Sequence, residues 1–180
     1  DLLIIRQDYE IIINKIKRGE AHLLSEGDTM YLGACRKGQK GDSLIGQPCS
    51  DEGAPRRAFC LKMAYMRTVL QFVLESKENA VTNLRVPQGQ LVTEQELKTQ
   101  SFDQILLNRF VPFIGKGYQT IAAEKGVNIS NNPKNKFAMI ANAIAVSEKC
   151  FNINRSEEFV KAGLTMKTIR VQYNGSIKEA

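Results

Sequence analysis

The first third of the chain alternates short apolar segments with polar loops. Asp8 precedes apolar residues at helical spacing, and cations and Gly19 follow them, so we expect a helix over about residues 8–18. Residues 29–34 and 58–61 contain β-forming and apolar side chains and predict two short strands. This order indicates strands flanked by helices.

The segment between the two predicted strands is rich in turn-forming residues. Residues 36–43 combine basic side chains with Gly38 and Gly41, which is typical of a flexible basic loop. Residues 44–56 hold two glycines and two prolines, which interrupt the chain too often for a regular element, and we expect none there. Apolar residues three and four apart then predict an amphipathic helix over residues 63–75 with one buried face.

The second half of the chain begins with a polar segment and then becomes helical again. Residues 76–100 lack sustained periodicity, so we interpret them as a linker with at most a short strand. Stripes of apolar residues predict a helix that starts after Ser101, a short helix over residues 118–125 and a third helix over residues 134–148. Residues 163–173 alternate apolar and polar side chains, which predicts a strand.

These patterns predict a mixed α+β (α/β) fold in two parts, residues 1–75 and 101–180, joined by a linker over residues 76–100. The composition agrees with packed domains, because 43% of the 180 residues are hydrophobic and 24% are charged. The net charge is +6, and residues 134–180 carry most of the excess, with 8 basic and 4 acidic groups. A positive excess of this size permits nucleic-acid binding but does not require it.

Cysteine and histidine are too few and too scattered for a zinc site. The four cysteines include no C-x-x-C pair, and His22 is the single histidine of the sequence. Without a serine elbow, His22 does not indicate a nucleophilic triad either, so we expect a structural role for it. We also expect reduced thiols and a cytoplasmic location, since no apolar run reaches the length of a membrane span.

Clusters of basic residues lie next to the predicted strands. The loop that follows residue 36 lacks the lysine directly before a Ser or Thr that a nucleotide-binding P-loop needs. Its cations and backbone amides instead suit the phosphates of a nucleic acid, with a solvated charged surface as the alternative. The clusters are Arg36, Lys37 and Lys40; Arg56, Arg57 and Lys62; and Lys161, Lys167 and Arg170.

The segment from Ser156 to Ile169 contains part of the residue pattern of metal-dependent nucleases. In those enzymes an acidic residue precedes a strand with an acid-x-lysine triplet; the two acids hold Mg²⁺, and the lysine orients the attacking water. Here Glu158 and Lys167 stand at the first acidic position and at the lysine, whereas Thr165 replaces the second acid. Glu158 is thus a candidate metal ligand, and with Lys167 a candidate catalytic residue, in an incomplete site. A plain edge strand is the alternative interpretation.

The N-terminal part of the chain resembles a known family, the mismatch-repair nuclease MutH and the two-domain type II restriction endonucleases that cut at GATC. The resemblance covers about residues 5–75 and is closest to the restriction enzymes. The matching segments are His22-Leu23-Leu24-Ser25-Glu26-Gly27, continuing as Asp28-Thr29-Met30-Tyr31-Leu32-Gly33-Ala34-Cys35-Arg36-Lys37-Gly38; Gln47-Pro48; Ser50-Asp51; Arg57-Ala58-Phe59-Cys60-Leu61-Lys62; and Tyr65-Met66.

This resemblance implies a restriction-endonuclease-like fold in which a strand, a basic loop and a second strand that leads into a helix contact the major groove of DNA and its phosphates. The resemblance and the basic clusters together assign DNA binding to Arg36, Lys37, Lys40, Arg56, Arg57, Lys62 and Tyr65.

Residues 101–180 resemble the start of a second copy of the same fold, in which three helices precede the active-site strand. At the aligned active-site positions this chain has Asn142, Glu158, Thr165 and Lys167. The resemblance therefore implies a degenerate and catalytically inactive copy. In the related restriction enzymes the carboxy-terminal domain is similarly degenerate and is regarded as an effector domain that binds a second GATC site.

The implied partner is double-stranded DNA that contains GATC, and the implied cofactor is Mg²⁺, bound by a longer parent enzyme whose cleavage residues lie outside this chain. Two alternatives stay open. In one, Glu157, Glu158 and Lys167 still form a working Mg²⁺ site that nicks DNA. In the other, the chain is an interaction or dimerisation module, and the helices over residues 63–75 and 134–148 bury apolar faces against a second copy or the rest of the parent chain.

Overall fold

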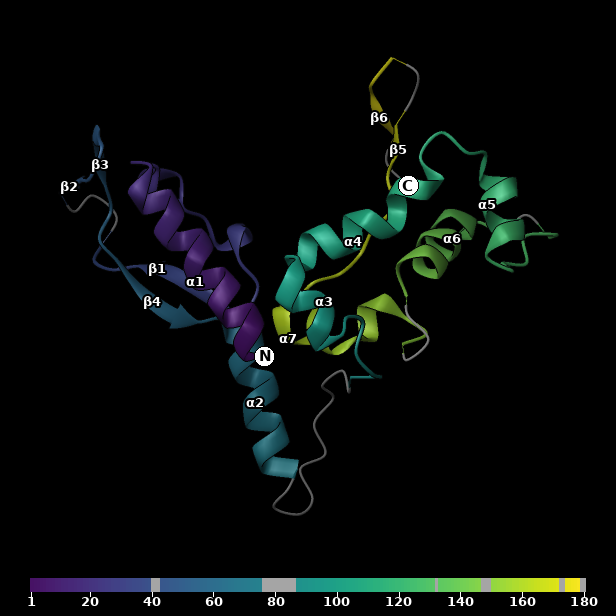
Figure 1. Ribbon diagram of the computed structural model, residues 1–180, viewed down its shortest axis with the longest axis horizontal. Coiled ribbons are helices and arrows are strands. Elements are labelled where there is room, and N and C mark those ends of the chain that lie inside the picture. The colour runs from purple at the N-terminus through teal and green to yellow at the C-terminus, as the bar shows by residue number, and fades with distance from the viewer. Residues whose placement is uncertain (40–42, 76–86, 132, 147–149, 172–173, 179–180) are drawn as a thin grey trace. The chain divides into compact units, whose positions relative to one another are not determined.

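The computed structural model describes residues 1–39, 43–75, 87–131, 133–146, 150–171 and 174–178. Helices and two-stranded antiparallel sheets make up the chain, which confirms the predicted mixed α+β class (Figure 1). The chain divides into two compact units. Unit 1 is Asp1–Asn83, Leu97–Ser101 and Lys161–Gly163, and unit 2 is Leu84–Glu96, Phe102–Val160 and Leu164–Ala180.

The elements follow one another in a fixed order along the chain. The helices are α1 (Leu2–Lys17), α2 (Met63–Glu75), α3 (Glu94–Thr99), α4 (Phe102–Phe110), α5 (Tyr118–Glu124), α6 (Lys136–Ala145) and α7 (Glu157–Ala162), with short 3-10 helices η1 (Ala21–Leu23), η2 (Glu26–Asp28), η3 (Val111–Phe113) and η4 (Ile153–Arg155). The strands are β1 (Leu32–Arg36), β2 (Ile45–Gln47), β3 (Ser50–Ala54), β4 (Arg57–Leu61), β5 (Arg170–Val171) and β6 (Ile177–Lys178). None of the described helices has the length and apolar character that crossing a membrane requires.

Helix α1 begins at Leu2 rather than at Asp8, because the residues before Asp8 continue the apolar helical pattern. Asp8 is therefore not an N-cap. Its side chain is buried, and its carboxylate accepts the backbone N–H groups of Met30, Tyr31 and Leu32 at 2.8, 2.6 and 2.9 Å. Charge-assisted hydrogen bonds of this kind compensate the carboxylate for its lost hydration. They fix the start of β1 to α1.

Strands β1 and β4 form an antiparallel pair, which confirms that two strands lie in this part of the chain, although β1 starts three residues later than the expected 29–34 and includes Arg36. Leu32 lies opposite Leu61, and α1 runs along the pair (Figure 1). The ring of Tyr9 on α1 lies 5.3 Å from the ring of Phe59 on β4. The strand pair is thus supported by a helix on one face.

A disulfide joins Cys35 in β1 to Cys60 in β4, so the expectation of reduced thiols is wrong for this pair. The two residues are 25 positions apart in the sequence, and the pairing of the strands brings them together. Cys49 and Cys150 are free. A bridge that closes a loop of this length stabilises a fold by about 3 kcal/mol in the chain-entropy description.

Strands β2 and β3 form a hairpin in the segment for which no regular element was expected. Pro48 and Cys49 lie in its turn, where Cys49 adopts a φ of 60°. The pairing is irregular between Ile45 and Gln47. The prolines and glycines therefore shape a short, irregular hairpin rather than exclude one.

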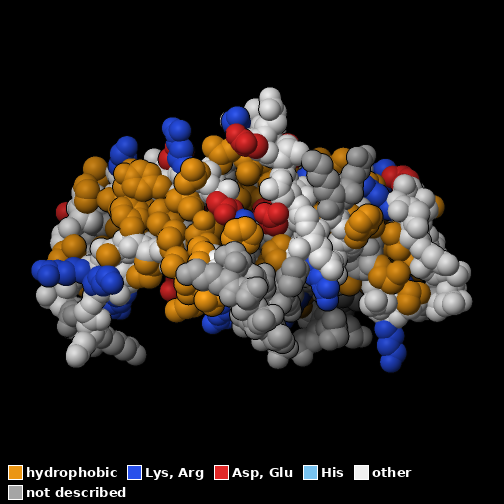
Figure 2. All heavy atoms as spheres, turned by 90° about the horizontal axis from the view of Figure 1, so that it is seen from below, with side chains coloured by type: hydrophobic (Ala, Val, Ile, Leu, Met, Phe, Trp, Pro, Cys, Tyr) orange, Lys and Arg blue, Asp and Glu red, His pale blue; other side chains and the backbone are white. Residues whose placement is uncertain are grey.

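Helix α2 has the predicted bounds, but the predicted buried face is largely exposed. Met63, Leu70 and Val73 of that face are all exposed, whereas Tyr65 in the first turn is buried. Figure 2 shows hydrophobic side chains gathered over the part of the molecule formed by unit 1. The apolar spacing predicted the helix correctly, but it did not predict that most of the apolar face is exposed.

Unit 2 contains the three helices expected after Ser101, with somewhat shorter bounds. Its core includes Ile121 and Ala122 of α5 and Ile140 and Ile144 of α6. Part of the predicted linker is also packed in this unit, because Leu91 and Val92 are buried there, whereas α3 from Leu97 onward belongs to unit 1. Residues 76–86 of that linker lie outside the described residues.

The strand predicted over residues 163–173 is wrong for most of its length. Residues 164–169 form no strand, β5 is two residues long, and residues 172–173 lie outside the described part. Alternating side chains do not make a strand without a partner for the backbone. The N–H of Met166 donates instead to the side chain of Asn154 at 2.6 Å.

We predict that Asp8→Asn lowers the free energy of unfolding by about 2–4 kcal/mol, because an amide cannot accept all three backbone N–H groups and brings its own donors. Urea unfolding measures the loss, and hydrogen–deuterium exchange should show faster exchange at Met30, Tyr31 and Leu32.

The matched control is Glu10→Gln on the same helix, where the carboxylate is exposed and pairs with Arg6 at 3.3 Å. That change should cost less than about 0.5 kcal/mol. Equal effects of the two substitutions would contradict a special role for Asp8.

Candidate nucleic-acid interface

Three exposed cations surround one hollow at the end of the β1–β4 pair. The N–H of Lys37 donates to the carbonyl oxygen of Arg56 at 2.8 Å, which continues the pairing beyond Arg36 and Arg57. We call this site the basic hollow. It has a volume of about 210 Å³ and is lined by Arg36, Lys37, Ser43, Pro55 and Arg56.

The electrostatics of the basic hollow favour an anion. Its described lining residues include three cations and no acidic side chain. Cations gathered around one hollow repel one another, and an anion between them relieves the repulsion. Arginine also presents a planar set of donors that can bind a phosphate through two parallel hydrogen bonds. The arrangement therefore fits a phosphate group.

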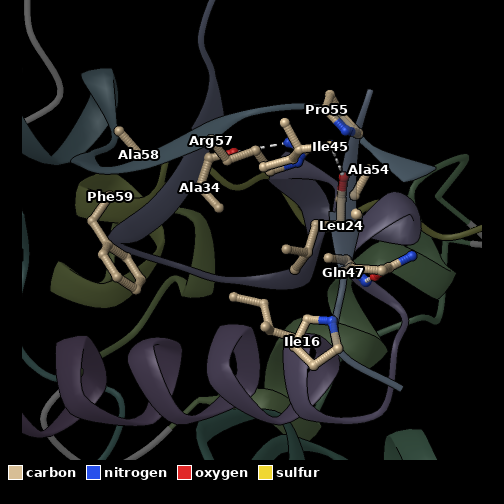
Figure 3. Close-up of a pocket in the computed structure, with 13 residues that line it drawn as sticks. Ile16, Leu24, Ala34, Ile45, Gln47, Ala54, Pro55, Arg57, Ala58 and Phe59 are labelled. Carbon is tan, nitrogen blue, oxygen red and sulfur yellow. Dashed lines mark hydrogen bonds between the residues drawn. The ribbon is translucent and has the colours of Figure 1, made fainter. Parts of the chain in front are cut away.

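Arg57, predicted to contact DNA, binds the backbone of its own unit. Its guanidinium donates to the carbonyl oxygens of Leu24 at 2.7 Å and Ala34 at 2.8 Å (Figure 3). Together with Ile16 and Phe59, these residues line a mostly apolar cavity of about 230 Å³. The geometry thus gives Arg57 a structural role, in which it holds the segment around Leu24 against β1.

Lys62 has a similar internal role. Its ammonium group donates to the carbonyl oxygens of Glu26 and Thr29, in the segment that leads into β1. Burial lowers the pKa of Lys62 below the ordinary value of 10.5, although nearby carboxylates, Asp8 foremost among them, act in the opposite direction. Lys62 therefore positions the chain ahead of β1, whereas the prediction gave it a phosphate contact.

Tyr65 belongs to the core of unit 1 rather than to a DNA-facing surface. It is 8% exposed, and its ring stacks on that of Tyr31 with the centroids 4.7 Å apart. Its predicted DNA contact would require the side chain to leave this packing. Lys40, the remaining residue assigned to DNA binding, lies outside the described residues.

Glu158, the predicted Mg²⁺ ligand, is buried and holds the backbone of a neighbouring segment. Both of its oxygens accept the N–H of Leu91, at 3.1 and 3.0 Å, and one also accepts the N–H of Val92 at 3.1 Å. Lys167 and Thr165 are exposed residues of an irregular segment. Within the described ranges, no group of three or more His, Cys, Asp or Glu residues is placed to hold a metal ion.

These contacts give Glu158 a structural role, and the described residues do not fit a Mg²⁺ site. A carboxylate with both oxygens bonded to backbone amides would have to lose those bonds before it could bind a cation. The catalytic role predicted for Glu158 and Lys167 stays a prediction that this geometry does not favour.

His22 has the structural surroundings that the sequence led us to expect. Its Nδ1 lies 2.9 Å from the side-chain nitrogen of Gln47, and its Nε2 lies 2.9 Å from a carboxylate oxygen of Glu52. Gln47 also accepts the N–H of Ala21 at 2.8 Å. These bonds tie the β2–β3 hairpin to the chain after α1.

Sequence reasoning missed Pro55 of the basic hollow and did not single out Ser43. Ser43 is the last residue of the predicted basic loop over residues 36–43, and Pro55 lies near the end of the segment that was expected to be irregular. The polar loop after Arg36 was a usable signal for Ser43, but the position of Pro55 depends on the hairpin that separates the two basic clusters.

No family model matches this chain. It is 32% identical over 182 residues to the type II restriction enzyme Sau3AI of Staphylococcus aureus, in an alignment that covers all of this chain and 36% of that enzyme. The chain thus spans about a third of the length of this relative. The similarity supports a relationship to restriction endonucleases along the whole chain.

The lowered pKa of Lys62 predicts a pH dependence of stability. Between the folded-state pKa and the ordinary value of 10.5, the unfolded chain binds more protons than the folded one. The free energy of unfolding therefore rises with pH in that window. We expect wild-type protein to gain stability relative to Lys62→Met as the pH rises from 8 toward 10.5, as measured by urea unfolding.

Lys17→Met provides the control, because Lys17 is an exposed lysine on α1. Its stability should differ from that of wild type by a constant amount over the same pH range. A constant difference for Lys62→Met as well would show that the Lys62 ammonium carries no burial penalty.

Proposed function

We propose that this chain is the DNA-recognition part of a GATC-specific type II restriction endonuclease. The observation that carries the proposal is the basic hollow, where three exposed cations meet at the end of the β1–β4 pair. The hollow lies in the segment that resembles the DNA-reading half of the MutH-like nucleases. The similarity to the type II restriction enzyme Sau3AI supports the same assignment.

In this proposal Arg36, Lys37 and Arg56 bind backbone phosphates of the duplex. Phosphate contacts set the register and orientation of a protein on DNA, while contacts to base edges carry the sequence specificity. Arg57 and Lys62 act as positioning residues, because their hydrogen bonds hold the chain around Leu24 and ahead of β1. The disulfide and α1 keep the strand pair in place behind the cations.

We assign DNA cleavage to other parts of a longer cytoplasmic enzyme. Because Glu158 is engaged by backbone amides, we place Mg²⁺ and the groups that hold it elsewhere in that enzyme. Unit 2 corresponds to the start of the degenerate domain that the sequence suggests, with an effector role at a second GATC site. In this proposal unit 2 also binds DNA, at that second site.

A second candidate function is a protein-interaction surface on α2. It is favoured by the exposed side chains of Leu70, Val73 and Leu74, because exposed apolar groups three and four residues apart lie on one face of a helix and favour burial against other protein. This function is compatible with DNA recognition if the α2 surface pairs with the rest of a parent enzyme. As a replacement for DNA recognition, it predicts self-association without affinity for a duplex.

We predict that Arg36→Ala combined with Arg56→Ala weakens duplex binding about tenfold or more at 0.1 M salt and makes the affinity less dependent on salt. Each lost phosphate contact should lower the slope of log K against log salt by about 0.9. Fluorescence anisotropy with a labelled duplex at several salt concentrations measures both effects.

The charge-matched control is Lys17→Ala combined with Arg67→Ala, which removes two exposed cations from α1 and α2. It should change affinity and slope much less. If both pairs of substitutions act equally, the binding follows net charge and the basic hollow is not the site. If wild-type protein binds no duplex and its mass rises with concentration, the interaction function replaces the proposed one.

A further inference from the structure

The Cys35–Cys60 disulfide lies next to the residues that form the basic hollow. Cys35 directly precedes Arg36 in β1, and Cys60 follows Arg57 by three positions in β4. In the strand register, Cys35 faces Ala58 and Cys60 faces Gly33, so the bond runs diagonally across one face of the pair. The next pair, Arg36 opposite Arg57, includes Arg36, which lines the hollow.

Beyond the disulfide, the described contacts that hold the end of the strand pair are the backbone bond from Lys37 to Arg56 and the side-chain bonds of Arg57. β1 and β4 form a two-stranded sheet, and such sheets are marginally stable without additional support. The terminal pair places two arginines opposite each other, and like charges at directly opposed positions destabilise a sheet. Arg57 escapes part of this repulsion by bonding to carbonyl oxygens. A covalent link one pair away restricts the fraying of this end.

We propose that the Cys35–Cys60 pair is a redox switch for the basic hollow. With the disulfide formed, Arg36, Lys37 and Arg56 are held close to the arrangement that binds a phosphate. With the two thiols reduced, the end of the strand pair frays. The free energy of ordering it again then lowers the affinity for the phosphate. Preorganisation of this kind raises affinity without adding a contact. The inference rests on the proposed DNA-binding function and adds its regulation.

The chemistry is thiol–disulfide exchange with a low-molecular-weight disulfide as the oxidant. One cysteine thiolate attacks that disulfide, forms a mixed disulfide and releases one small thiol. The second cysteine then attacks the mixed disulfide, forms the Cys35–Cys60 bond and releases the second small thiol. The protein thus gives up two electrons and two protons, and one small disulfide becomes two small thiols. A small dithiol reverses the reaction.

The other two cysteines have different surroundings. Cys35 and Cys60 are half-buried at the surface of the strand pair, whereas Cys150 is fully buried in unit 2. Burial is the largest influence on Cys150 and raises the pKa of its thiol, which makes it a poor nucleophile. Cys49 is exposed in the β2–β3 turn and can react with the same reagents. It therefore serves as the control cysteine.

The test is duplex binding by the 180-residue chain in oxidised glutathione and in dithiothreitol, with the state of each cysteine determined by alkylation and mass spectrometry. We expect the oxidised form to bind about fivefold tighter or more, the size of effect that fixing one or two side chains produces. Cys49→Ser should keep this difference. The double variant Cys35→Ser and Cys60→Ser should bind like the reduced wild type in both buffers.

Hydrogen–deuterium exchange on reduced wild-type protein tests the same point if the double variant does not fold. Reduction should lower the protection of residues 33–36 and 57–60 and leave the protection of α1 unchanged. Equal affinity of the oxidised and reduced forms overturns the switch and leaves the proposed function intact. Cysteines 35 and 60 that stay reduced in oxidised glutathione also overturn it. Absence of duplex binding in both buffers overturns the proposed function and the switch together.

Discussion

A single buried carboxylate, that of Asp8, determines how unit 1 is built. Its three hydrogen bonds to consecutive backbone N–H groups attach the start of β1 to the middle of α1. The register of β1 against β4 then sets where Arg36 and Lys37 lie relative to Arg56. Lys62 donates to the carbonyl oxygens of Glu26 and Thr29, just ahead of the same segment. On the approach to β1, the Asp8 carboxylate thus binds backbone N–H groups and the Lys62 ammonium group binds backbone carbonyl groups. The basic hollow depends on this framework.

Unit 2 uses the same physical device at a different place. Glu158 on α7 is buried and accepts the N–H groups of Leu91 and Val92, which holds an irregular segment against a helix. In both units a helix carboxylate replaces the hydrogen bonds that an irregular backbone loses when it is buried. Glu158 matches an acidic position of the nuclease-like sequence pattern, but in this fold its carboxylate holds backbone N–H groups.

Local patterns predicted what depends on neighbouring residues in the sequence. The bounds of α2, the strands β1 and β4, and the exposed basic residues Arg36, Lys37 and Arg56 all followed from periodicity and composition. What failed depends on residues far apart in the chain. The role of Asp8, the Cys35–Cys60 bond and the internal bonds of Arg57 arise only once the strands pair. The strand expected around Lys167 failed for the same reason, because alternation does not supply a partner strand.

We propose that unit 1 recognises DNA at GATC. The most direct measurement is a titration of the chain against a duplex that contains GATC and a matched scrambled duplex, at two salt concentrations and with Ca²⁺ in place of Mg²⁺ so that cleavage does not compete. We predict that the GATC duplex binds about tenfold tighter or more, and that this ratio persists when salt weakens both complexes. Equal affinity for the two duplexes at both salt concentrations would contradict sequence recognition and leave only phosphate binding.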